Sequence, residues 1–167
     1  MGFRKGFCFA LLASFVLAGC ASHHGTSARL NKKERLKASA IQAAGEEGGW
    51  AARRAGVTNY PDLVAKAVEH GREKPDLLLP VFSASIGVDG AAASGQELIL
   101  GTTLYFAGDQ SFAAALENAP LSAKWASALL LCDSFLFGLD WDGSIRLKAA
   151  DYPKTYAMVA GMRRGNH

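Results

Sequence analysis

The sequence contains little cysteine, with three residues in 167. They are Cys8, Cys20 and Cys132, and the first two lie in an N-terminal stretch with the features of a signal peptide. Because a single cysteine then remains in the body of the chain, an intramolecular disulfide is excluded. Cys132 lies within an apolar run, which predicts a small buried side chain. A reactive thiol needs a cationic neighbour that favours the thiolate, and none stands nearby in the sequence.

Histidine is also scarce, with four residues, and no two of them have the spacing of metal ligands on a helix. The chain lacks the GxSxG, P-loop, HExxH and CxxC patterns. These absences predict no catalytic residues, no metal and no cofactor. Asp140 and Asp142 ahead of Gly143 are similar to the start of a calcium loop, but the later acidic ligand of such a loop is missing. We therefore expect an acidic turn there.

A large excess of one charge is missing as well. The 18 basic residues stand against 15 acidic ones, and Arg4 and Lys5 of the signal-like stretch are among the 18. A nucleic-acid-binding surface needs Lys and Arg clustered on one face, so no nucleic acid is expected as a partner. A local basic run within residues 32–37 suits either a solvated helix start or contact with anionic lipid headgroups. Such contact is worth about 1 kcal/mol per basic residue.

The sequence has no apolar run long enough for a transmembrane helix, which needs roughly 20 residues. The run from Ala126 to Leu139 is too short and is interrupted by Asp133. The run from Gly6 to Ala18 is also too short, but Arg4 and Lys5 precede it. A positive start followed by a short apolar run is typical of a secretory signal peptide.

The apolar run ends in Leu17, Ala18, Gly19 and Cys20, which resembles the lipobox of bacterial lipoproteins. The resemblance implies that residues 1–19 are removed and that Cys20 receives a diacylglyceryl thioether and an acyl chain such as palmitate. The alternative is an ordinary secretory signal with an incidental cysteine. Two or more acyl chains anchor a protein firmly, so the membrane is an expected partner. Residues 20–31 are then expected to form a lipidated flexible tether.

The residue after the lipidated cysteine bears on localisation. Ala21 stands there rather than aspartate, which under the enterobacterial sorting rule implies transport to the outer membrane, facing the periplasm. The outer leaflet of the inner membrane is the alternative.

The rest of the chain has the length of one domain, expected over residues 32–161 with a flexible tail at 162–167. Residues 32–55 predict a helix with a flat face of small residues. Its glycines each cost about 1 kcal/mol relative to alanine, so they either admit a close backbone or break the helix. A second helix is expected from Pro61, at a first-turn position, to its stop at Gly71.

The middle of the chain has the composition of strands. Residues 77–82 are apolar but contain Pro80, which suits an edge strand or an extended segment. Residues 97–106 combine β-branched and aromatic residues, which favours a strand. Asp142 and Gly143 predict the turn of a hairpin spanning residues 139–147. The expected fold class is therefore α+β, a mainly helical single domain with a small antiparallel sheet or hairpin.

Helical periodicity returns in the second half of the chain. Ser111 is expected to cap a helix that ends at Asn118, and Ser122 a longer helix after Pro120. A last short helix is expected from Asp151 to Gly161. On the longer helix, a stripe is expected to face the core and pack against Leu104 and either Ile99 or Leu100. That stripe comprises Trp125, Leu129, Cys132 and Leu136.

Residues 43–81 resemble the N-terminal part of DotC-like lipoproteins, outer-membrane core components of type IVB secretion and of related conjugation systems. Five residues match the glycine-rich segment of that family, and Leu79, Pro80 and Val81 match a later leucine and proline segment without its second proline. The family is about twice as long as this chain, and the resemblance ends at Val81. The glycines of this segment can admit a close backbone, either from the same domain or from a partner subunit, so the segment is a candidate interface. The five matching residues are Gly45, Gly48, Gly49, Ala51 and Arg53, of which all but Ala51 are the candidate interface residues.

Two functional classes follow from these features. The first is a non-enzymatic assembly or scaffold subunit of an envelope complex, such as secretion or conjugation machinery. The second is a lipid-tethered binding or enzymatic module whose site is built from scattered residues. Tyr105, Asp109, Trp141 and Arg146 are the candidates for such a site.

Overall fold

The computed structural model describes residues 31–137 and 146–164, and this part of the chain contains helices and no strand. The expectation of an α+β fold is therefore wrong, because the protein is all-helical over the described residues. The elements are α1 (Lys32–Gly45), α2 (Glu47–Arg54), α3 (Tyr60–His70), η1 (Pro75–Leu78), α4 (Leu79–Ser83), α5 (Gly90–Ala107), α6 (Asp109–Asn118), α7 (Leu121–Phe137) and α8 (Pro153–Arg164).

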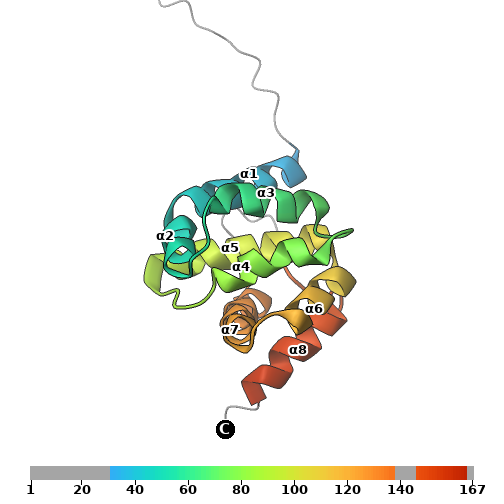
Figure 1. The fold of residues 1–167 in the computed structure, drawn as a ribbon. Helices are drawn as coiled ribbons and strands as arrows, with labels where there is room; N and C mark the ends of the chain where they lie inside the picture. The colour runs from blue at the N-terminus through green and yellow to red at the C-terminus, as the bar shows by residue number, and fades with distance from the viewer. Residues whose placement is uncertain (1–30, 138–145, 165–167) are drawn as a thin grey trace, which may run out of the picture.

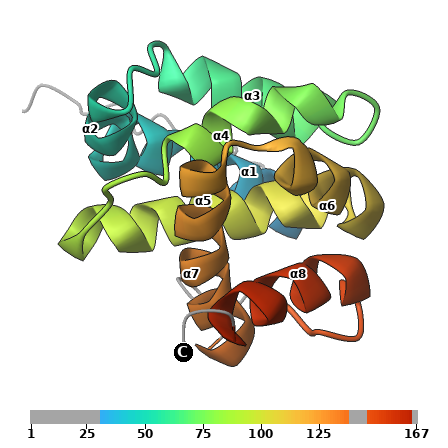
Figure 2. The same ribbon diagram turned by 60° about the horizontal axis from the view of Figure 1, so that its bottom comes forward.

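The helices stack in layers around α5. Helices α1 and α3 lie side by side at the top of Figure 1, α5 and α4 lie beneath them, and α6, α7 and α8 form the lower part. Turning the molecule brings α7 and α8 forward and shows α7 crossing in front of α5 (Figure 2). The start of α1 and the whole of α8 therefore lie at opposite poles of the domain.

The helix expected over residues 32–55 is divided into α1 and α2. Asn31 caps α1 by accepting a 3.0 Å hydrogen bond from the backbone N–H of Glu34. The division falls at Glu46, whose φ of −94° and ψ of −110° lie outside the helical region. The break follows directly after Gly45, while Gly48 and Gly49 lie inside α2 and pack closely against neighbouring atoms.

Residues 77–82 are not extended, because they belong to η1 and α4. Pro75 and Pro80 each lie in the first turn of their element, where a backbone N–H would have no partner within the helix, so its absence in proline costs nothing. Proline therefore starts two short helices here and does not mark a sheet edge.

Residues 97–106 are also not a strand, because they form most of α5. Three consecutive residues, Leu98, Ile99 and Leu100, are buried together with Thr102 and Thr103. Helix α5 packs against α1, α2, α3 and α7, so it is covered on several sides. A helix covered on several sides carries apolar residues around its whole circumference. Its sequence therefore lacks the 3.6-residue periodicity by which a helix is distinguished from a strand.

Helix α7 turns a different face to the core from the expected one. Leu129 is 55% exposed, so its placement in the core is wrong, and Trp125 and Cys132 are only partly buried. The residues that α7 buries are mostly small: Ala123, Ser127, Ala128, Leu131 and Ser134. Small side chains let α7 approach α4 and α5 closely. An expectation that places the largest apolar residues of a helix in the core does not predict this face.

The other expected helices are present. Helix α3 begins next to Pro61 and ends before Gly71. Helix α6 ends at Asn118 as expected, but it begins at Asp109. Helix α8 extends to Arg164, three residues past the expected stop at Gly161. The hairpin expected at 139–147 falls largely on residues 138–145, which lie outside the described residues.

Candidate functional site

Gly48 and Gly49 lie inside the domain at the junction of α1 and α2. A Cβ at Gly48 would stand 3.0 Å from the carbonyl oxygen of Ala43 and 3.0 Å from Cδ1 of Ile99. A Cβ at Gly49 would stand 2.6 Å from the carbonyl oxygen of Ala44. Both glycines are buried, and the close approach that they permit is between neighbouring helices of this domain.

The other two candidate interface residues, Gly45 and Arg53, are exposed rather than buried. Gly45 is exposed, and the nearest atom to a Cβ there would be the Pro61 ring at 3.9 Å. Arg53 is exposed on α2. The structure therefore does not gather the four candidate residues into one exposed face, because two of them are core packing residues.

A chain of buried polar side chains joins α3, α5, α7 and the end of α4. The Tyr60 hydroxyl donates to Oε1 of Gln96 at 2.8 Å. Nε2 of Gln96 donates to the carbonyl of Val81 at 2.8 Å and to the Ser85 hydroxyl at 3.1 Å. The Ser127 hydroxyl donates to that of Ser85 at 3.1 Å. Burial raises the pKa of Tyr60 well above its ordinary value, so the hydroxyl stays protonated and keeps its donor role.

This polar chain is structural. Its hydrogen bonds connect helices that are distant in sequence, and satisfied buried polar groups of this kind fix how helices pack. Sequence reasoning did not identify Gln96, because a lone glutamine between small and apolar residues gives no pattern that predicts burial.

Asp109 begins α6 and also caps α8. Its two carboxylate oxygens accept hydrogen bonds from the backbone N–H groups of Lys154 at 2.9 Å and Thr155 at 2.8 Å. Both N–H groups belong to the first turn of α8, where they have no partner within their own helix. Asp109 was a candidate for a scattered binding site, and the structure gives it this capping role between two distant helices.

The other scattered candidates do not form a complete site. Tyr105 packs edge-on against Phe106, with ring centroids 5.3 Å apart. It also lies near Tyr152, whose pKa is raised first by burial and then by the proximity of Tyr105 and of Asp109. Arg146 is exposed, and Trp141 lies outside the described residues.

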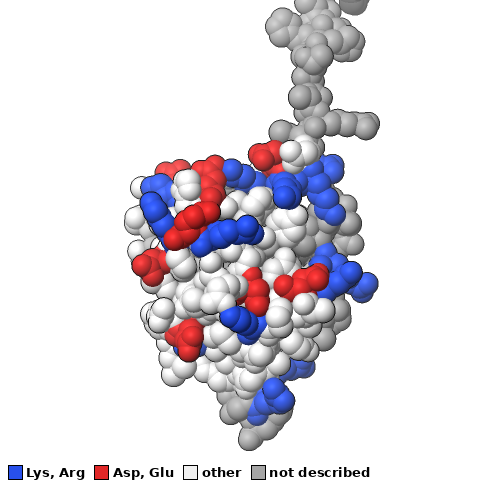
Figure 3. All heavy atoms as spheres, turned by 90° about the vertical axis from the view of Figure 1, so that its right-hand side faces the viewer, with Lys and Arg blue, Asp and Glu red and all other residues white. Residues whose placement is uncertain are grey.

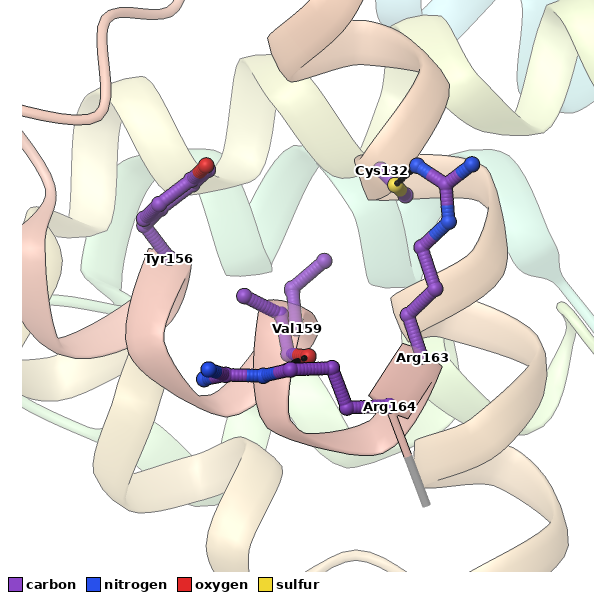
Figure 4. Close-up of a pocket in the computed structure, with 6 residues that line it drawn as sticks. Cys132, Tyr156, Val159, Arg163 and Arg164 are labelled. Atoms are coloured by element: carbon purple, nitrogen blue, oxygen red, sulfur yellow. Dashed lines mark hydrogen bonds between the residues drawn. The ribbon is translucent and has the colours of Figure 1, made fainter. Parts of the chain in front are cut away.

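A cavity of about 360 Å³ lies between α7 and α8. Figure 4 shows Tyr156 at one side and Cys132 with Arg163 at the other. Nη1 of Arg163 lies 3.3 Å from Sγ of Cys132, within hydrogen-bonding distance for sulfur. Cys132 was expected to be buried among apolar residues, but it is only partly buried and has a cationic neighbour. The remaining lining residues are Val159, Ala160 and Arg164.

An apolar ridge on the surface of α7 leads to this cavity. We use the name α7 ridge for Leu121, Trp125, Leu129 and Cys132, which recur at intervals of four, four and three residues. Leu121 is 70% exposed and Leu129 is 55% exposed. The two exposed leucines and the partly buried Trp125 and Cys132 share one face of α7, so together they form an apolar strip along the helix.

Charged residues flank the α7 ridge. Asp133 lies beside Glu97 of α5, and burial together with the nearby charge of Asp133 raises the pKa of Glu97. Arg163 and Arg164 lie on the other side, at the cavity. On the face seen in Figure 3, charges of both signs are interspersed, without a single large positive or negative field.

Within residues 31–137 and 146–164, no group of three or more His, Cys, Asp or Glu side chains is placed to hold a metal ion. In the same part of the chain, each helix is too short or too polar to cross a membrane. Comparison of the chain with protein-family models, with curated proteins and with solved structures gives no match. The resemblance of residues 43–81 to DotC-like lipoproteins stays a prediction.

Proposed function

We propose that the protein is a lipoprotein of the bacterial cell envelope that acts as a non-enzymatic assembly subunit. The observation that carries this proposal is the succession of Arg4 and Lys5, a short apolar run, and Leu17 to Cys20. In the proposal, residues 1–19 are removed and lipid on Cys20 anchors the chain at the outer membrane, on its periplasmic side. The outer leaflet of the inner membrane is the alternative location.

The arrangement of the domain supports a role in assembly. The buried polar side chains Tyr60, Gln96, Ser85 and Ser127 bind one another across helices, so they serve the packing of the domain. The α7 ridge instead leaves large apolar side chains in solvent. Such a surface favours a contact with another protein.

The anchor is tested by the mass of the mature N-terminus of the full-length protein expressed in a bacterial host. We expect a chain that begins at Cys20 and carries a diacylglyceryl group and an acyl chain. Cys20→Ser should leave uncleaved precursor, because a hydroxyl does not replace the thiol in thioether formation. Cys132→Ser is the matched control and should be lipidated normally. An unmodified terminus at Ala21 or Ser22 would refute the proposal.

Localisation is tested by separating the two membranes on a density gradient. The proposal expects the lipidated protein with the outer membrane. Recovery with the inner membrane would contradict the outer-membrane assignment and leave the lipid anchor intact.

A ligand-binding role is the second candidate, and the cavity between α7 and α8 favours it. Its volume of about 360 Å³ falls in the range of small-molecule sites. Arg163 and Arg164 beside Val159 suit an amphiphile with an anionic head and a short apolar body. Titration with octanoate, with octylamine as the cationic control, tests this role, and equal binding of the two would exclude it.

A further inference from the structure

The α7 ridge extends over most of the length of its helix. From Leu121 to Cys132 the helix rises about 17 Å at 1.5 Å per residue. Leu121 and Leu129 are largely exposed, while the core side of the same helix carries Ala123, Ser127 and Leu131. The side chains of Leu121 and Leu129 therefore contribute little to holding α7 in the domain.

The two flanks of the α7 ridge carry opposite charges at the same height. Cys132 and Asp133 follow Leu129 by three and four residues, so they project on opposite sides of it. The Cys132 side leads to Arg163, whose guanidinium lies 3.3 Å from the thiol. The Asp133 side leads to Glu97 of α5. Because Cys132 and Asp133 are consecutive, the basic and acidic flanks lie level with each other.

An apolar ridge with one acidic and one basic flank is complementary to itself. In a symmetric dimer the same patch meets its own copy, so every group has to find its complement elsewhere on that patch. A two-fold axis that runs along α7 places the ridges of two copies face to face. It also places the acidic flank of each copy against the basic flank of the other.

We propose that a second copy of this chain docks on the α7 ridge, with Asp133 of each copy facing Arg163 of the other. Leu129 then meets the Leu129 of the second copy near the axis, and the pair of exposed leucines is removed from water. The inference rests on the proposed function only in treating the domain as an assembly subunit, since it does not require lipid on Cys20.

The opposite charges give a test in which two defective variants repair each other. Asp133→Arg makes both flanks basic, and Arg163→Glu makes both flanks acidic, so neither variant pairs with itself. A mixture of the two restores an opposite-charge pair at both contacts of the dimer. Both residues are exposed, so the substitutions leave the core untouched.

The experiment uses full-length chains that carry one of two different epitopes in the exposed α2–α3 loop at Thr58. Two chains are co-expressed, solubilised in excess detergent and captured by one epitope, and the second epitope is quantified. We expect wild-type copies to be recovered together, and each variant paired with itself to be recovered at least tenfold less. Asp133→Arg paired with Arg163→Glu should return to the wild-type level.

Three results would overturn the inference. In the first, wild-type copies are not recovered together. In the second, the variants paired with themselves associate as well as wild type does. In the third, the mixed pair is not restored, which would refute the pairing of Asp133 with Arg163 across the dimer. The N-terminal mass of the same preparations reports on the lipid anchor independently, so a failure of the proposed function is distinguishable from a failure of the dimer.

Discussion

Replacement of Tyr60 by phenylalanine tests whether the buried polar chain holds the helices together. The substitution keeps the ring and removes the hydroxyl that donates to Oε1 of Gln96 at 2.8 Å. Gln96 is fully buried, so its Oε1 is left without a partner and without access to water. An orphaned buried acceptor of this kind costs about 1 to 3 kcal/mol.

The cost is measurable by thermal unfolding of the purified protein, followed by the circular dichroism of its helices. For a protein of this size, 1 kcal/mol corresponds to a shift of roughly 2 to 4 °C in the melting temperature. We expect Tyr60→Phe to lose about 4 to 8 °C if the cost is near 2 kcal/mol. Gln96→Leu should cost more, because it strands the Tyr60 hydroxyl and removes the donor to the carbonyl of Val81.

The double variant Tyr60→Phe/Gln96→Leu separates a shared hydrogen bond from two independent effects. If the two residues act through one bond, the double variant should cost less than the sum of the single variants. A loss below about 0.5 kcal/mol for Tyr60→Phe, within the scatter of ordinary substitutions, would refute a structural role for this hydrogen bond.

Four further predictions follow from the packing. Leu131→Ala should cost about 2 to 5 kcal/mol and Leu129→Ala under about 1 kcal/mol in urea unfolding, because the first side chain is buried and the second exposed. Gly49→Ala should cost about 1 to 3 kcal/mol, since its Cβ would stand 2.6 Å from a backbone oxygen, and an unchanged midpoint would contradict that packing. Asp109→Ala should cost about 0.5 to 2 kcal/mol and increase hydrogen exchange in the first turn of α8, and exchange that stays slow there would refute the capping role. The raised pKa of Glu97 means that folding favours its protonated form, so the contribution of Glu97 to the free energy of unfolding is lost as pH rises through that pKa. Glu97→Gln should remove this part of the pH dependence of stability. Identical pH profiles of stability for the two proteins would refute the prediction.

The helix boundaries at proline and glycine were predictable, and the interior of the domain was not. Pro61 lies in the first turn of α3, where its missing N–H is not needed, and α3 ends before Gly71, which itself keeps helical dihedral angles. Helix α5 was mistaken for a strand because surrounding helices cover it, and burial on several sides removes the periodicity that identifies a helix. The burial of Leu131 and the exposure of Leu129 were also not predictable from the sequence, because they depend on which face of α7 is covered by α4 and α5.

The candidate site shows the same limit. A sequence search for a cation near Cys132 finds none, yet Arg163 lies 3.3 Å from its thiol because α8 packs back against α7. Asp109 likewise gives no local sign that it caps a helix that begins at Pro153. Contacts of this range require the fold, whereas the predicted lipobox at Leu17 to Cys20 rests on contiguous residues and needs only the sequence.

The composition of α7 connects its packing with the proposed assembly role. A helix that only needed to stabilise the domain would turn its leucines inward, because each buried leucine contributes about 1.5 to 3 kcal/mol. Helix α7 turns Leu131 inward together with Ala123, Ser127 and Ala128, but it leaves Leu121 and Leu129 in solvent. Leu131 and the small residues pack α7 against the domain, so Leu121 and Leu129 are left for a second contact. If that contact is another copy of the chain, the exposure of Leu129 has a function that the isolated domain does not reveal, and Leu129→Ala should weaken recovery of paired copies while leaving the melting temperature nearly unchanged.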